Sequence, residues 1–193
     1  DGQSSRGLGD VYKRQGAPFI KPEMEGAGSK SEPGQPDLPT MSTYYAVEPG
    51  KIFTINASIK ESEVIENVEV VPFETWNSQP TGVIEKGVTY QQSSSFPANI
   101  ATVSDPMVFR DIVMVQVSVT PFQYNPVSKT LTVIQDVDLE LVESGETELP
   151  HIPQKKSREF EKLYRSLIVN YPSTVREGDD DYQRPSILYV LPN

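Results

Sequence analysis

The stretch IVMVQVSVTPFQYNPVSKTLTVIQDVDLELV, residues 112–142, decides the fold of this sequence. Residues 112–119 are almost entirely apolar and rich in β-branched side chains, a composition typical of a buried β-strand. Pro121 ends this strand because proline has no backbone N–H to give to a sheet. Residues 125–129 have the composition of a turn, and along residues 130–142 the leucines and most valines share one parity. The stretch therefore predicts a strand that returns through a hairpin.

Further strand signals precede this hairpin. Residues 51–59 alternate between two faces, of which one is more apolar, and residues 64–73 repeat the pattern after an expected turn at residues 61–63. Weaker signals fall at residues 43–47 and 88–90, the latter within a long stretch of expected loops. The sequence upstream of the hairpin thus adds several short strands.

The fold class that these signals predict is mainly β: an antiparallel β-sandwich over residues 40–150 with one C-terminal amphipathic helix. Roughly six to eight strands without alternating helices favour this architecture. The helix is expected within residues 151–172, a linker plus helix, where Ser157 can cap its start and Pro172 stops it. Its apolar side chains recur at helical spacing and form one stripe: Phe160, Leu163, Tyr164, Leu167 and Ile168.

The segments on either side of this domain have a different composition. Residues 16–39 are rich in Gly, Pro, Ser and Glu and are expected to form an extended leader. Residues 173–185 form an acidic linker that we expect to be cleavable, although the aspartates at 179–181 could alternatively bind calcium. Residues 186–193 start a new apolar strand, which we interpret as the truncated beginning of a next domain.

Residues 1–15 are interpreted as an artefact or a disordered end. Residues 5–15, SRGLGDVYKRQ, resemble the in-frame translation of a transposase-type sequencing adapter, and such scars are excluded from fold arguments. An adapter here implies a metagenomic fragment whose gene is cut at its 5′ end. The alternative interpretation is a basic, flexible N-terminal arm.

The composition argues against several classes of protein. The net charge of −10 argues against nucleic-acid binding, which needs clustered Lys and Arg. The sequence has no cysteine, its one histidine lies between prolines in an expected linker, and it has no glycine-rich phosphate loop. No apolar run approaches the roughly 18–20 residues that cross a bilayer. We therefore expect a fragment without a catalytic centre, cofactor, metal site or membrane span.

Several segments together resemble the propeptide of the C25 peptidase family, the gingipain-like cysteine peptidases of Bacteroidetes. The most specific is the PFQYNP hairpin at residues 121–126, which follows the strand at residues 117–120. The other segments that carry the resemblance are GQPDLP (34–39), IENVEVVP (65–72), FRD (109–111), KTLTV (129–133) and FEKLY (160–164). The resemblance covers roughly residues 34–171.

This resemblance implies a β-sandwich prodomain that precedes a caspase-like catalytic domain. Residues 186–193 would then be the truncated first strand of that peptidase domain. It would keep the enzyme latent and assist its folding, and the catalytic Cys and His would lie in the following domain. The implied partner is the cognate C25 catalytic domain, joined covalently at first and non-covalently after cleavage. The family also implies a secreted protein, located from the periplasm to the cell surface or outside the cell.

The resemblance also suggests which residues act. An inhibitory prodomain places a substrate-like residue in the specificity pocket, and Arg110 is the candidate because it follows a proline-bearing loop and precedes the strongest strand. The alternative is that Arg110 pairs with Asp111 or another carboxylate and orders the loop. Arg176 and Arg184 flank the acidic linker and are candidate maturation cleavage sites.

A second function fits the same fold. A non-catalytic β-sandwich could serve as a binding or adhesion module of a secreted bacterial protein. It would need an exposed aromatic platform, for which the candidates are Tyr44, Tyr45, Phe73 and Trp76. A free-standing hydrolase is disfavoured because no nucleophile and base are arranged together.

Overall fold

The computed structural model describes residues 8–14, 17–74, 85–149 and 158–171. Strands dominate these residues, together with one 3₁₀ turn and one α-helix. In chain order the elements are β1 (Leu8–Arg14), β2 (Ala17–Pro22), β3 (Gly28–Ser29), β4 (Pro39–Ala46), β5 (Lys51–Ile65), η1 (Val88–Gln91), β6 (Ala101–Val103), β7 (Met107–Phe109), β8 (Ile112–Val119), β9 (Phe122–Asn125), β10 (Thr130–Glu146) and α1 (Arg158–Leu167).

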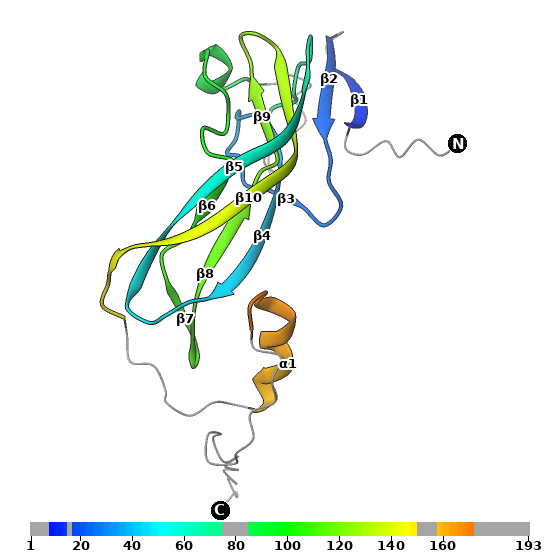
Figure 1. The fold of residues 1–193 in the computed structure, drawn as a ribbon. Coiled ribbons are helices and arrows are strands. Elements are labelled where there is room, and N and C mark those ends of the chain that lie inside the picture. Colours follow the sequence, from blue (N-terminus) through cyan, green and yellow to red (C-terminus); the bar gives the residue numbers. More distant parts are fainter. Residues whose placement is uncertain (1–7, 15–16, 75–84, 150–157, 172–193) are drawn as a thin grey trace, which may run out of the picture. The chain divides into compact units, whose positions relative to one another are not determined.

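The strands form three sheets, whose order can be followed in Figure 1. One sheet has the order β5-β10-β9, and another has the order β3-β4-β8-β6, with β7 also paired to β8. The remaining pair is β1-β2, which is antiparallel like the pairs β9-β10, β3-β4, β6-β8 and β7-β8. The expected class, antiparallel β-sheets with one C-terminal helix, is confirmed.

The stretch that decides the fold forms strands where expected, but the pairing differs from the prediction. β8 covers residues 112–119, yet its neighbours are β4 and β6, and the partner of β10 is β9. Pro121 interrupts the chain between the two sheets, so that Tyr124 of β9 pairs with Leu131 of β10. The turn is fixed by Asn125, whose side-chain oxygen accepts the N–H groups of residues 127 and 128, both at 3.1 Å.

Three local predictions upstream are wrong. The strand expected at residues 64–73 does not form, because β5 ends at Ile65, Asn67 takes a left-handed φ of 58°, and only isolated bridges at Val70 and Pro72 follow. The expected turn at residues 61–63 is the continuation of β5, where exposed polar side chains are compatible with a solvent-facing strand. Cross-strand pairs support this part of β5, because Lys60 lies 2.9 Å from Asp138 and Glu63 accepts from Gln135 at 3.3 Å. The expected strand at residues 88–90 is the 3₁₀ turn η1.

The chain forms two compact units. Unit 1 comprises residues 1–42, 54–103 and 117–142, and unit 2 comprises residues 43–53, 104–116 and 143–193. The core of unit 1 contains six buried hydrophobic residues: Leu38, Val68, Val70, Phe122, Tyr124 and Leu131. Strands β4, β5, β8 and β10 each contribute residues to both units.

The segment expected as an extended leader is part of unit 1. It contains β2 and β3, and it buries Phe19 and Leu38, which are 4% and 1% exposed. Gly34 in this segment has a φ of 82°, and a Cβ there would lie 2.9 Å from the backbone N of Gly87. The close approach allows the Gly87 N–H to donate to the Gly34 carbonyl at 2.8 Å.

Residues 8–14, within the segment interpreted as an adapter, are placed in β1 and pair with β2. A backbone ladder forms with many sequences, so this pairing is compatible with either origin of the segment. The adapter interpretation stays a prediction.

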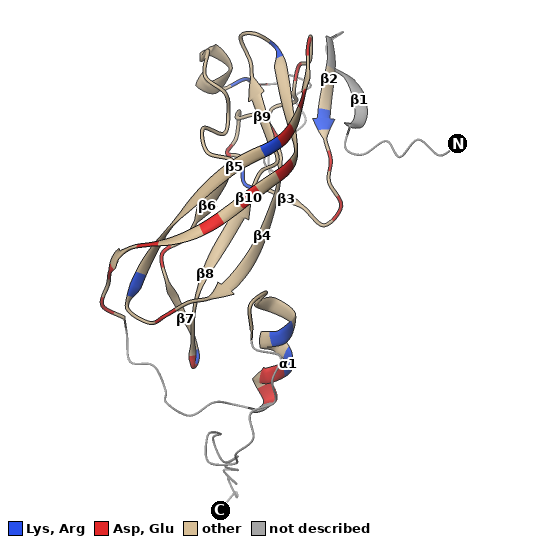
Figure 2. Cartoon of the chain, viewed as in Figure 1, with Lys and Arg blue, Asp and Glu red and all other residues tan. Residues whose placement is uncertain are grey.

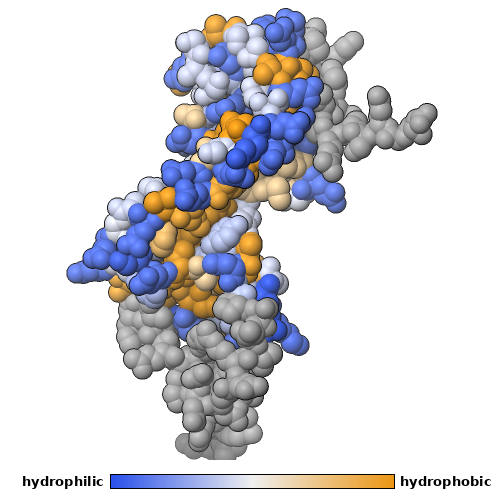
Figure 3. Space-filling view, in the orientation of Figure 1, coloured by the Kyte–Doolittle hydropathy of each residue, from blue (hydrophilic) through white to orange (hydrophobic). Residues whose placement is uncertain are grey.

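Acidic side chains lie along β10, which carries no Lys or Arg, whereas α1 carries side chains of both signs (Figure 2). In unit 2, Lys51 lies 2.9 Å from Glu143 and 3.1 Å from Glu146, and hydrogen bonds to these two carboxylates raise its pKa. On the face shown in Figure 3, hydrophobic residues lie in patches between hydrophilic ones. The surface therefore has the negative character expected from the composition.

Candidate functional site

The β7–β8 hairpin in unit 2 carries the candidate residue Arg110 at its tip. Phe109 pairs with Ile112, so that only Arg110 and Asp111 form the turn. Arg110 has a φ of 58°, a left-handed value that a hairpin of this length requires at its first central position. Glycine is the residue that usually takes this position, and a non-glycine residue held there costs about 1–3 kcal/mol. An exposed arginine is thus held in a strained, narrow turn.

Helix α1 packs in the same unit as the hairpin. Its apolar stripe is partly buried, because Tyr164 and Ile168 are 0% and 3% exposed, whereas Leu163 and Leu167 are each 38% exposed. The predicted helix is therefore confirmed, although only part of its stripe faces a core. Met114 of β8 lies in this core, which also holds several partly buried hydrophobic residues: Tyr44, Ala46, Phe109, Ile112, Phe160 and Tyr171.

Hydrogen bonds join the residues just after α1 to Tyr44 and Ala46, which lie in the first segment of unit 2. The N–H of Val169 donates to the carbonyl of Tyr44 at 2.9 Å. Asn170 bonds the backbone of Ala46 twice, accepting its N–H at 2.7 Å and donating to its carbonyl at 2.9 Å. These bonds hold the end of α1 beside the C-terminal end of β4.

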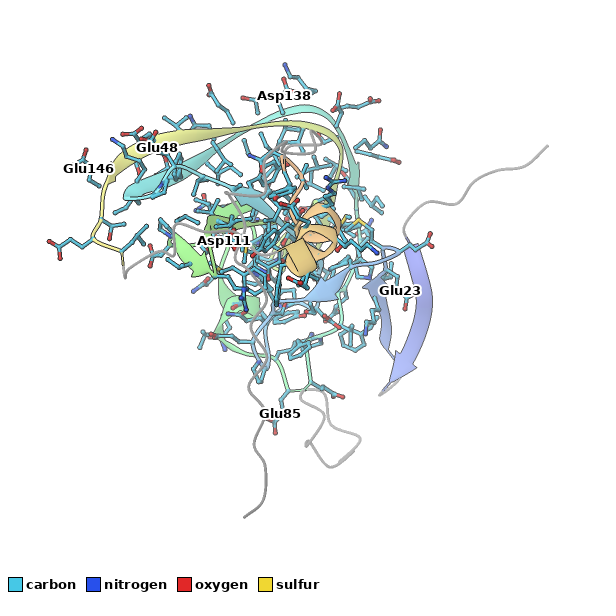
Figure 4. The ribbon with its side chains drawn as sticks, turned by 90° about the horizontal axis from the view of Figure 1, so that it is seen from below. Glu23, Glu48, Glu85, Asp111, Asp138 and Glu146 are labelled. Atoms are coloured by element: carbon cyan, nitrogen blue, oxygen red, sulfur yellow. The ribbon has the colours of Figure 1, made fainter. Side chains whose placement is uncertain are left out.

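The two turn residues make separate contacts with α1. The guanidinium of Arg110 lies over the ring of Phe160, 4.1 Å from its centroid. The hydroxyl of Tyr164 donates to Oδ1 of Asp111 at 2.5 Å. Oδ2 of Asp111 is buried and has no hydrogen-bond partner among the described residues. Figure 4 shows Asp111 beside α1, whereas Glu48 and Glu146 of the same unit lie at the periphery.

This geometry differs from the alternative in which Arg110 pairs with Asp111. Among the described residues no ion pair joins the two side chains: one stacks on a ring, and the other accepts a tyrosine hydroxyl. Burial, reinforced by the bond to Asp111, raises the pKa of Tyr164 well above its ordinary value. Tyr164 therefore stays protonated at neutral pH and acts as the donor in this bond.

The sequence did not indicate the roles of Phe160 and Tyr164 beyond the helical stripe. A hydroxyl in the middle of an apolar stripe was the available signal, because a buried tyrosine usually finds a hydrogen-bond partner. Around it, the ring centroids of Phe109, Phe160 and Tyr171 lie 6.0, 6.1 and 5.5 Å from that of Tyr164. Tyr164 is thus the centre of an aromatic cluster.

Of the other candidate residues, the structure describes Tyr44, Tyr45 and Phe73. Arg176, Arg184, Trp76 and His151 lie outside the described residues. Tyr44 belongs to the core of unit 2, and Phe73 is half-buried. The large hydrophobic residues that are exposed in the described part of the chain are aliphatic or methionine, so they form no aromatic platform.

A cavity of about 220 Å³ lies in unit 1, apart from the candidate residues. Several hydroxyl groups line this cavity. Those of Thr40 and Thr120 are hydrogen-bonded to each other at 2.7 Å, and that of Ser118 accepts from the Lys30 amine at 2.6 Å. In the pair of Lys30 and Ser118 the amine is the donor, so it does not accept the hydroxyl proton as a general base would. No group of three His, Cys, Asp or Glu side chains in the described ranges is placed to hold a metal ion.

Comparisons with known proteins match this chain over most of its length. The family model Propeptide_C25 matches residues 4–177. Gingipain R2 of Porphyromonas gingivalis is 30% identical over 179 residues, which are 86% of this chain and 23% of that protein. The chain therefore spans less than a quarter of the length of this curated relative.

Two solved structures share the fold. One is a complex of the pro- and mature domains of Porphyromonas gingivalis RgpB, with a TM-score of 0.70 and 27% identity over 84% of this chain and 86% of that one. The other concerns the zymogenic latency of gingipain K from the same organism, with a TM-score of 0.55 and 18% identity over 72% of this chain and 81% of that one. The fold and the matches define a peptidase prodomain. This chain belongs to the C25 propeptide family.

Proposed function

We propose that this chain keeps a secreted gingipain-type cysteine endopeptidase latent and assists the folding of its catalytic domain. The family match supports the role of a propeptide. The solved complex of the RgpB pro- and mature domains supports the partner, a C25 catalytic domain that is bound first within the precursor and then non-covalently after cleavage. Within the described part of the chain, no helix is long and apolar enough to cross a membrane. The site of action is the periplasm, the cell surface or the surrounding medium.

One observation carries the inhibitory role: an exposed arginine at the tip of a two-residue hairpin that is held by α1. A guanidinium presents planar donors that fit a carboxylate in a specificity pocket. The narrow turn restricts the backbone, so that little conformational entropy is lost when a peptidase binds it. The geometry favours a catalytic domain that prefers arginine.

The test is to add the whole chain to the RgpB mature domain and to measure the inhibition constant with a small arginyl substrate. We expect competitive inhibition, because Arg110 occupies the pocket that the substrate needs. In a second arm, the unfolded mature domain is refolded with and without the chain, and a higher yield of active enzyme is expected with it. A chain that neither inhibits the enzyme nor raises its refolding yield contradicts the proposed function.

We further propose that Arg176 and Arg184 are the maturation cleavage sites. They flank an acidic segment rich in aspartate, and such segments stay solvated and accessible to proteases. Mass spectrometry of the chain after limited digestion by the RgpB mature domain should give new ends after residue 176, residue 184 or both. Digestion that leaves both of these bonds intact while cutting elsewhere contradicts this assignment.

A further inference from the structure

We propose that Asp111 and Tyr164 form a clamp that makes the chain a resistant inhibitor rather than a substrate. The clamp would hold Asp111, the residue that follows Arg110. If a peptidase cleaved the Arg110–Asp111 peptide bond, the new amine of Asp111 would stay in place and the bond would form again. This inference rests on the proposed function, since it needs Arg110 to occupy the specificity pocket. It assigns a positioning role to two residues that do not themselves enter that pocket.

The chemistry of the reversal is that of acyl transfer. The thiolate of the peptidase attacks the carbonyl carbon of Arg110, the C–N bond to Asp111 breaks, and the leaving nitrogen takes up a proton as the amine of Asp111. A thioester then holds the segment that ends at Arg110. Water can hydrolyse this thioester, or the Asp111 amine can attack it, which restores the peptide bond and returns the thiolate. The outcome depends on whether the amine stays in place.

The structure holds both sides of this bond. On the acyl side, Phe109 pairs with Ile112 across the hairpin and packs against Tyr164. On the amine side, Asp111 accepts the hydroxyl of Tyr164 at 2.5 Å. An amine held beside the thioester acts at a high effective concentration, which reaches about 10⁵–10⁸ M in well-oriented intramolecular reactions.

The clamp is itself anchored. Tyr164 is fully buried within the aromatic cluster, and α1 is tied to Tyr44 and Ala46 by backbone and side-chain hydrogen bonds. Only one oxygen of Asp111 is satisfied by described residues, because Oδ2 is buried without a partner. The Tyr164 hydroxyl is therefore the contact on which the position of this carboxylate depends.

The experiment compares Tyr164→Phe with the parent chain, each incubated with the RgpB mature domain at equal occupancy. Fragments that end at residue 110 and begin at residue 111 are quantified by mass spectrometry over time. We expect Tyr164→Phe to inhibit at first like the parent and then to be cut at this bond at least about 10-fold faster, a change that corresponds to about 1.4 kcal/mol. Asp111→Ala, which removes the same bond from the other side, should behave alike.

The matched control is Tyr90→Phe, which removes a tyrosine hydroxyl that donates to the carbonyl of Val70 at 2.7 Å in unit 1. It should be cut as slowly as the parent, and so should Asp111→Asn, which keeps an oxygen acceptor for Tyr164. If the parent inhibits but Tyr164→Phe and Tyr90→Phe are cleaved at the Arg110–Asp111 bond at equal rates, the clamp proposal is wrong. If the parent neither inhibits nor is cut at this bond, the proposed function fails instead.

Discussion

We expect replacement of Arg110 with alanine to raise the inhibition constant of this chain against an arginine-preferring C25 catalytic domain by at least about 100-fold. Arg110 is the only basic residue in the β7–β8 turn, and its side chain is exposed at the tip. Removing one partner of a buried, hydrogen-bonded charge pair costs about 2–5 kcal/mol, because the other charge stays buried and unpaired. In the free parent chain Arg110 contacts the ring of Phe160, and it would give up this contact on entering the pocket. The alanine variant has no such contact to lose, but this difference offsets only a small part of the cost.

Steady-state inhibition measures this effect, with Lys162→Ala as the matched control. Lys162 is an exposed cation on α1 in the same unit, so its loss tests whether net charge alone matters. Arg110→Gly is a useful second variant, since glycine takes a φ of 58° without strain and should fold at least as well while losing inhibition. Full potency of both Arg110 variants would show that another residue occupies the pocket.

The second large effect is on stability. Tyr124→Ala should lower the free energy of unfolding by about 3–5 kcal/mol, the range found when a buried aromatic side chain is truncated. Tyr124 is 1% exposed, pairs with Leu131, and stacks edge to face with Tyr90 at 6.1 Å. Burial raises the pKa of Tyr124 to about 12, so its hydroxyl stays protonated and donates to the carbonyl of Val68 at 3.2 Å.

Urea unfolding of the parent, Tyr124→Ala and Tyr124→Phe separates the two contributions. The phenylalanine variant loses only the hydrogen bond and should be destabilised by about 1 kcal/mol. Equal midpoints and slopes for the alanine and phenylalanine variants would mean that the ring adds nothing to the core of unit 1.

The positions of the four longest strands, β4, β5, β8 and β10, could be predicted from the sequence, but their partners and the short strands could not. The parity of β10 and the β-branched run of β8 are local properties, whereas assignment of the two strands to different sheets depends on β9, which is short and follows a proline. The prediction of a turn at residues 61–63 was wrong for a related reason. Polar residues indicate exposure, and an exposed strand is stabilised by pairs such as Lys60 with Asp138 that no local pattern reveals.

The candidate site was only partly predictable. Arg110 could be selected because the hairpin sequence resembles a known family. The contact of Asp111 with Tyr164 joins residues 53 positions apart, and helical periodicity shows only that Tyr164 faces a core. The stacking of Arg110 on Phe160 likewise needs the folded structure of unit 2.

The order of α1 and the two arginines along the chain has a consequence for activation. Arg176 and Arg184 follow α1, so cutting after either of them leaves the hairpin and the helix that holds it on one fragment. Such a cut removes the tether but no contact between the fragment and its enzyme. In the proposed mechanism, the local concentration of this chain at the enzyme would then fall from the roughly millimolar value of a tethered segment to its free concentration in the medium. Activation would thus be governed by dilution, and crowded cells would restrain the enzyme longer than dispersed ones.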